Sequence, residues 1–156
     1  MSLESPESAD AGRLALLIEL LARCGEARIA VSGSSMLPSV WPGDVLTIRR
    51  CDATELLRGD LAVFTRGGRL FAHRFVGHDG DRLVTQGDAV PLPDPPVSAA
   101  ELLGTAVSIS RSGKSIAFRT APGLPARLVA ALARRSSGAA RLLQRGQALR
   151  RRLVVA

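Results

Sequence analysis

The chain contains few aromatic residues, few cysteines and only one lysine. Of its 156 residues 3% are aromatic, with no tyrosine and one tryptophan, so stacking platforms for single-stranded nucleic acid are not expected. The two cysteines, Cys24 and Cys51, cannot make a disulfide framework and do not have metal-ligand spacing. We therefore expect neither a metal nor another cofactor. The hydrophobic content of 46% is high enough for one domain with a buried core.

Long uncharged apolar runs are absent as well. The best candidate for a membrane span, residues 14–22, is too short and contains Glu19. Acidic residues precede it, where a secretory signal would carry basic ones. These residues are Glu4, Glu7 and Asp10. We expect no transmembrane span and no signal peptide, and a cytoplasmic or peripheral membrane location.

Charge is distributed unevenly along the chain. Residues 1–118 contain all 14 acidic side chains and 12 basic ones, whereas residues 119–156 contain nine arginines and no acid. The formal charge of +7 therefore arises from the tail, which could contact an acidic surface. Leucines recur on one side of this segment at helical spacing. We consider a packed or oligomer-forming helix, an anionic membrane surface as partner, and nucleic acid, which is not expected because no base-reading motif is present.

The distribution of apolar residues divides the chain into four parts. We expect a disordered N-terminus over residues 1–11, a helix over 12–25, a β domain over 26–120 and an Arg-rich amphipathic helical tail over 121–156. Within the β domain, short apolar runs bounded by turn residues predict strands. These runs are 27–31, 44–49, 61–65, 70–76, 82–85, 104–109 and 115–119.

Turn residues indicate how these strands connect. Residues 66–69 and 78–81 predict tight hairpin turns. The proline-rich segment 91–96 cannot form a central strand, because proline lacks the N–H that a ladder requires, and a short helical turn is expected at 98–103. The sequence thus predicts a compact, strongly bent and mainly β domain.

Two adjacent serines, Ser34 and Ser35, follow Gly33 in a turn-rich stretch. A serine hydroxyl becomes a nucleophile only beside a base and near amides that hold the oxyanion. His73, on an apolar strand that places Phe71 and Phe75 on the same face, is the best candidate for the base. Read from composition alone, the stretch is better explained as a polar loop between strands.

Other groups that could take part in such chemistry are few. His78 lies in a Gly/Asp turn and is expected at the surface, and Lys114 is the only lysine. Asp88 and Asp94 could each orient a histidine base. Spacing does not choose between them, because the members of a catalytic triad meet in space rather than in sequence.

Six motifs occur in an order that resembles a known family. They are Gly33-Ser-Ser-Met-Leu-Pro38, Pro42-Gly-Asp44, Arg58-Gly-Asp60, Ala72-His-Arg-Phe-Val-Gly77, Gln86-Gly-Asp88 and Leu103-Gly-Thr-Ala-Val107. Residues 28–110 thereby resemble the catalytic domain shared by type I signal peptidases and LexA-type self-cleaving repressors. The resemblance implies a bent β domain of the β-clip type and serine endopeptidase activity on a peptide or preprotein leader.

The resemblance also implies roles for individual residues. Ser35, directly before the methionine, would be the nucleophile, and the backbone N–H groups of Ser34 and Ser35 would hold the oxyanion. His73 stands where the family often has a lysine, which is similar to the archaeal and endoplasmic-reticulum branch. Asp88, and as the alternative Asp94, would support the histidine. Met36 would pack beside the nucleophile and the substrate pocket.

The sequence departs from the family in three respects. Gly33 occupies a position where many signal peptidases carry a serine that assists the oxyanion. No N-terminal membrane anchor is apparent, and the residues before the domain are too few for a DNA-reading module. Two other functions therefore stay open: a catalytically silent binding or scaffold module with this fold, and a membrane- or nucleic-acid-associated regulator acting through the basic tail.

Overall fold

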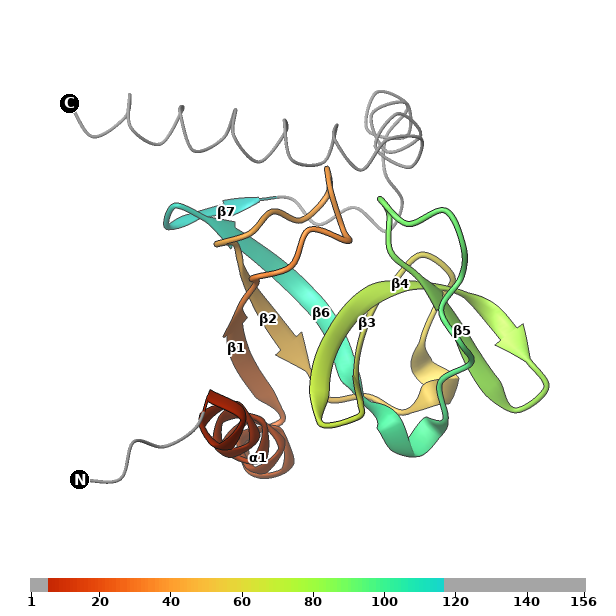
Figure 1. The fold of residues 1–156 in the computed structure, drawn as a ribbon, viewed down its shortest axis with the longest axis horizontal. Coiled ribbons are helices and arrows are strands. Elements are labelled where there is room, and N and C mark those ends of the chain that lie inside the picture. The colour runs from red at the N-terminus through yellow and green to blue at the C-terminus, as the bar shows by residue number, and fades with distance from the viewer. Residues whose placement is uncertain (1–5, 117–156) are drawn as a thin grey trace.

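A computed structural model of the chain describes residues 6–116 as an antiparallel β sheet flanked by one helix (Figure 1). Its elements are α1 (Pro6–Cys24), β1 (Glu26–Ala30), β2 (Val45–Arg49), β3 (Leu61–Arg66), β4 (Arg69–Asp79), β5 (Arg82–Gln86), β6 (Leu102–Arg111) and β7 (Lys114–Ile116), with 3-10 turns η1 (Ala53–Glu55) and η2 (Ala99–Glu101). The strand order is β1-β2-β6-β3-β4-β5, and β7 pairs with β6. The mainly β prediction is confirmed. The expected helical tail, residues 121–156, lies outside the described residues.

The N-terminal helix is longer than the sequence pattern indicated. It begins at Pro6, so residues 6–11, expected to be disordered, are helical. Proline suits this first position, because its φ is already helical and its missing N–H has no partner in the first turn. Leu17 and Leu21 bury the helix against the sheet, whereas Leu16 remains 57% exposed. Within residues 6–116, no helix combines the length and the apolar character needed to cross a bilayer.

Each predicted strand of the β domain has a counterpart in the sheet, although residues 117–119 of the last predicted run lie outside the described residues. Both predicted hairpin turns are confirmed, since they join β3 to β4 and β4 to β5. The predicted helical turn is shorter than expected: η2 ends at Glu101, and Leu102 and Leu103 already belong to β6. Close packing explains why β6 carries Gly104, because a Cβ there would collide with the backbone carbonyl oxygen of Arg49.

The bent sheet encloses two core clusters. The first core cluster consists of Leu17, Leu21, Ala27, Met36, Val40, Leu46, Ile48, Leu61, Val63, Ala106 and Ile109. The second core cluster consists of Leu56, Ala62, Phe64, Phe75, Leu83 and Val97. Strand β3 contributes to both, because successive side chains of a strand point to opposite faces. The two clusters therefore lie on either side of β3.

Candidate active site

The loop between β1 and β2, residues 31–44, carries the two adjacent serines and is closed at its base. The Val31 N–H donates to the Asp44 carbonyl at 2.8 Å, and the Gly43 N–H donates to the Val31 carbonyl at 2.7 Å. The carboxylate of Asp44 is fully buried and accepts two hydrogen bonds from Arg111 of β6, at 2.8 and 2.7 Å. These contacts fix the loop on the sheet, and we call it the serine loop.

Met36 anchors the serine loop to the first core cluster. Its side chain is only 4% exposed and packs with that cluster, as does Val40. The resemblance implied that Met36 lies beside the nucleophile and a substrate pocket. It does directly follow Ser35, but at this burial it can offer a substrate almost no surface. Its position in the structure is that of a core residue which holds the serine in place.

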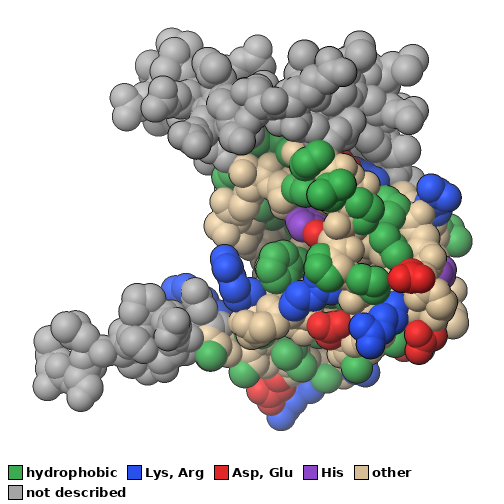
Figure 2. Space-filling view, turned by 45° about the vertical axis from the view of Figure 1, so that its right-hand side comes forward, with side chains coloured by type: hydrophobic (Ala, Val, Ile, Leu, Met, Phe, Trp, Pro, Cys, Tyr) green, Lys and Arg blue, Asp and Glu red, His purple; other side chains and the backbone are tan. Residues whose placement is uncertain are grey.

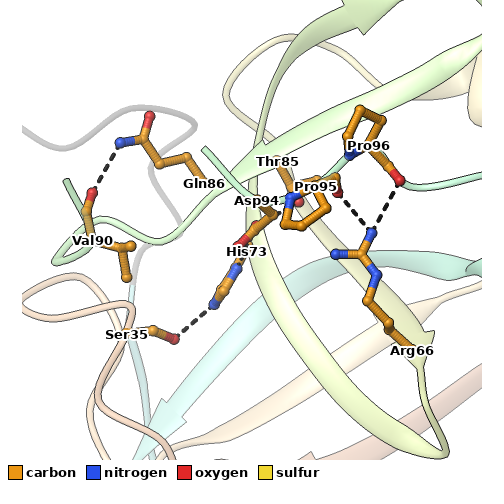
Figure 3. A network of polar contacts seen from close by, with 9 residues as sticks. All are labelled: Ser35, Arg66, His73, Thr85, Gln86, Val90, Asp94, Pro95 and Pro96. Atoms are coloured by element: carbon orange, nitrogen blue, oxygen red, sulfur yellow. Dashed lines mark hydrogen bonds and ion pairs between the residues drawn. The ribbon is translucent and has the colours of Figure 1, made fainter. Parts of the chain in front are cut away.

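Ser35, His73 and Asp94 form a continuous chain of hydrogen bonds (Figure 3). The Ser35 hydroxyl lies 2.8 Å from His73 Nε2, and His73 Nδ1 lies 2.6 Å from Asp94 Oδ2. A carboxylate can only accept, so Nδ1 carries the proton and Nε2 is left to accept from the serine. Figure 2 shows a histidine and an acidic side chain side by side near the middle of one face, bordered by hydrophobic and uncharged atoms.

His73 lies on β4, on the face that the alternation pattern predicted. The rings of Phe64 and Phe71 meet its imidazole edge-on, with centroids 6.1 and 6.0 Å away. Burying a polar ring among aromatics is unfavourable unless its nitrogens are hydrogen-bonded. Here Ser35 and Asp94 satisfy both nitrogens. The packing limits how the ring can tilt, and the two hydrogen bonds determine its direction.

Asp94 belongs to the proline-rich loop after β5, which brings it back over the sheet. Its N–H donates to the Thr85 carbonyl at 2.8 Å, and the Thr85 hydroxyl donates to Asp94 Oδ2 at 2.6 Å. Burial acts to raise the pKa of Asp94, but hydrogen bonds from His73 and Thr85 and the nearby charges of His73 and Arg66 outweigh it, so the pKa lies below its ordinary value. The carboxylate is therefore ionised near neutral pH.

The other candidate acid, Asp88, does not serve His73. It accepts two hydrogen bonds from Arg74, at 2.8 Å each, and one from the Ser39 hydroxyl at 2.5 Å. Of the two candidate acids that the sequence left open, Asp94 rather than Asp88 lies within hydrogen-bond distance of His73. Arg74 follows His73 on β4 and therefore points to the opposite face of the sheet, which is where Asp88 lies.

The turn that carries Asp88 packs directly against Ser35. The Ala89 N–H donates to the Ser35 carbonyl at 2.8 Å. A Cβ added to Gly87 would lie 2.7 Å from the same carbonyl oxygen, closer than real Cβ contacts allow. The Ser34 and Ser35 N–H groups have no acceptor among residues 6–116. They are thus available to a bound group.

The remaining candidate groups lie elsewhere. His78 is exposed and contacts the Phe75 ring, as expected for a surface residue. Lys114 is exposed at the start of β7 and pairs in register with Arg111. Burial, together with the charges of Glu55, Asp60 and Asp52, raises the pKa of the Cys51 thiol to about 11, so it is a poor nucleophile near neutral pH. Within the described part of the chain, no group of three or more His, Cys, Asp or Glu is arranged to hold a metal.

Sequence reasoning missed Arg66, the last residue of β3. Its guanidinium donates to the Pro95 carbonyl at 2.7 Å and to the Pro96 carbonyl at 3.1 Å (Figure 3). Nothing in the local sequence marks this arginine, because its partners lie about thirty residues further along the chain.

Comparison with known proteins adds no information: no family model matches the chain, and no curated protein matches it.

Proposed function

We propose that this chain is a serine endopeptidase of the signal-peptidase-like class, which cleaves a peptide or leader segment by a Ser–His–Asp mechanism. One observation carries the proposal: Ser35 Oγ, both His73 nitrogens and Asp94 Oδ2 are joined by contacts of 2.8 and 2.6 Å. An ordinary solvated loop is not expected to place these three groups in hydrogen-bond contact. The strongly bent sheet, with the serine loop packed beside the turn after β5, supports the finer β-clip assignment.

The reaction follows from the hydrogen bonds. Ser35 Oγ attacks the peptide carbonyl carbon while its proton passes to His73 Nε2. Asp94 accepts from Nδ1 and stabilises the imidazolium that forms. His73 then gives the proton to the leaving amine, the C–N bond breaks, and an ester on Ser35 remains. Water, deprotonated by His73, hydrolyses the ester and restores the serine hydroxyl.

Free backbone amides support this mechanism. The Ser34 and Ser35 N–H groups lack partners among residues 6–116, and such donors could stabilise the negative oxygen of the tetrahedral intermediate. Gly33 supplies no hydroxyl for this purpose, so the backbone would act alone. A substrate bound in extended conformation would add main-chain pairing beside the serine loop.

A fluorophosphonate probe tests the nucleophile without knowledge of the substrate. Attack by Ser35 Oγ forms an O–P bond, fluoride leaves, and His73 takes the proton. We expect one adduct by intact mass, located on Ser35, and its loss in both Ser35→Ala and His73→Ala. The matched control is Ser34→Ala, which removes the adjacent hydroxyl and should be labelled as the wild type is.

Equal labelling of wild type and Ser35→Ala would end the enzyme proposal and favour a silent module with the same fold. If labelling succeeds, a library of peptides with small residues around the cut bond tests endopeptidase activity directly. Cleavage of the same bond by wild type and Ser34→Ala, but not by Ser35→Ala, is the expected result.

Gly87→Ala should slow the reaction of Ser35 without changing any polar group of the site. The added methyl carbon would lie 2.7 Å from the Ser35 carbonyl oxygen, so the backbone of the nucleophile must shift. A displacement of this kind is expected to slow phosphonylation by roughly 100-fold. Gly33→Ala is the control, since a Cβ there meets nothing within 4 Å. Equal rates for the two variants would show that contact with Gly87 does not position Ser35.

A further inference from the structure

Arg66 links two parts of the structure near the site. It lies on β3, the strand next to the one that carries His73, and contacts the loop that carries Asp94. It ends β3, and its side chain is 29% exposed. One of its terminal nitrogens donates to two successive carbonyls, of Pro95 at 2.7 Å and of Pro96 at 3.1 Å. Figure 3 shows the guanidinium directed at these two prolines, with Asp94 and His73 beside them.

The proline-rich loop has few backbone donors with which to bond to the sheet near Pro95 and Pro96. Its backbone hydrogen bonds to β5 are made by the Asp94 N–H, 2.8 Å from the Thr85 carbonyl, and by Val97, which exchanges two bonds with Leu83 at 2.8 and 2.7 Å. The Thr85 hydroxyl also donates to Asp94 Oδ2 at 2.6 Å. Between these points Pro95 and Pro96 have no N–H to donate. Among residues 6–116, Arg66 is the only donor to their carbonyls.

Arg66 also supports the wall behind the histidine. Its guanidinium lies 5.6 Å from the centroid of the Phe64 ring, which in turn meets His73 edge-on. Phe64 and Arg66 are two residues apart on β3, so they share the face on which His73 lies. The Arg66 side chain thus contacts both the prolines that follow Asp94 and the Phe64 ring that packs against His73.

We infer that Arg66 is a positioning residue of the triad, which holds Asp94 against His73 Nδ1 through the carbonyls of Pro95 and Pro96. The consequence for catalysis rests on the proposed peptidase function, whereas the effect on the His73–Asp94 hydrogen bond does not. Arg66 has no contact with Ser35: besides the two carbonyls and the Phe64 ring, its guanidinium lies 3.8 Å from the Glu101 carboxylate. A side chain that only stabilised the fold would leave this hydrogen bond unchanged when replaced.

The test compares Arg66→Gln, Arg66→Lys and Arg69→Gln in the full chain. Arg69 lies in the same hairpin, is exposed and has no polar partner among residues 6–116, so Arg69→Gln is the matched loss of charge. The first measurement is the deshielded His73 Nδ1 proton by NMR. The second is phosphonylation by the fluorophosphonate probe, separated into the maximal rate and the half-saturating concentration. Thermal unfolding confirms that each variant is folded.

We expect Arg66→Gln to broaden or shift the His73 Nδ1 proton and to lower the maximal rate roughly 10- to 100-fold, with little change in the half-saturating concentration. Arg66→Lys, which keeps the charge and can reach one carbonyl, should recover part of both effects. Arg69→Gln should behave as the wild type. If Arg66→Gln does not fold, Arg66→Lys still tests the inference through the same two readouts.

Two results would overturn the inference. One is an unchanged Nδ1 proton and rate in Arg66→Gln, or in Arg66→Lys if only the latter folds. The other is absence of the deshielded proton from the wild type. If instead the proton responds to Arg66 but no protein reacts with the probe, the positioning role stands and the peptidase proposal fails.

Discussion

Replacing Asp94 by asparagine is expected to slow phosphonylation of Ser35 by about 10,000-fold while leaving the fold intact. The carboxylate accepts a hydrogen bond from His73 Nδ1 at 2.6 Å. An asparagine amide in the same place can donate to Nδ1, which moves the imidazole proton to Nε2, where Ser35 needs an acceptor. The base would then be absent although the ring had not moved. Reaction with the fluorophosphonate probe, followed by intact mass, measures the effect.

Asp81→Asn is the control for this substitution. Asp81 is exposed in the turn between β4 and β5, so its replacement removes one acid from the same region without touching the triad. If Asp94→Asn and Asp81→Asn were phosphonylated at rates within about threefold of each other, Asp94 would have no role in the reaction. Asp88→Asn offers a second comparison, because Asp88 contacts Arg74 and Ser39 rather than His73.

The acid dependence of stability provides an independent readout of Asp94. Because its pKa is lowered in the folded protein, the carboxylate stabilises the fold at pH values above its ordinary pKa of 3.8. That contribution is lost as the pH falls below 3.8 toward the lowered value. The difference in free energy of unfolding between wild type and Asp94→Asn should therefore shrink below pH 3.8. If the difference in free energy of unfolding did not change with pH, the charge of the Asp94 carboxylate would not contribute to stability.

Arg74→Met should lower the free energy of unfolding by about 3–5 kcal/mol, because it leaves the carboxylate of Asp88 buried without its arginine. The two side chains are only 10% and 6% exposed. Arg74 also donates to the Gly59 carbonyl at 2.7 Å, so a second acceptor loses its donor. Urea unfolding followed by the fluorescence of Trp41, the single tryptophan, measures the change.

The control for the buried pair is an exposed pair on the same sheet. Arg49 lies 3.1 Å from Glu26, with side chains 62% and 49% exposed, and Arg49→Met should cost less than about 1 kcal/mol. In addition, Arg74→Met combined with Asp88→Leu should regain part of the loss, since no buried charge remains. Similar costs for Arg74→Met and Arg49→Met would mean that burial does not amplify the Arg74–Asp88 interaction.

The strands were predictable because their signal is local. Short apolar runs bounded by turn residues placed β3, β5 and both hairpins within one or two residues of the observed bounds. The start of α1 was not predictable in this way. Residues 6–11 are polar and small, and their helical state follows from continuity with a helix that Leu17 and Leu21 hold on the sheet.

Part of the candidate site could also be proposed from the sequence. A serine needs a base, and His73 on an apolar strand was the best available one, while the resemblance to signal peptidases singled out Ser35. The structure places these two groups 2.8 Å apart. The resemblance placed Met36 beside the nucleophile, but a motif position does not reveal which way a loop side chain turns. Here it turns into the first core cluster.

By itself, the sequence determined a mainly β domain, the strand that presents His73, and the loop that presents the serine, since each depends on residues close together in the chain. Only the tertiary structure decided that Asp94 rather than Asp88 meets the histidine, and that Arg66 donates to the carbonyls of Pro95 and Pro96 beside it. Both depend on where the proline loop crosses the sheet. That path is determined by Thr85, Val97 and Arg66, whose contacts join segments that no local pattern relates.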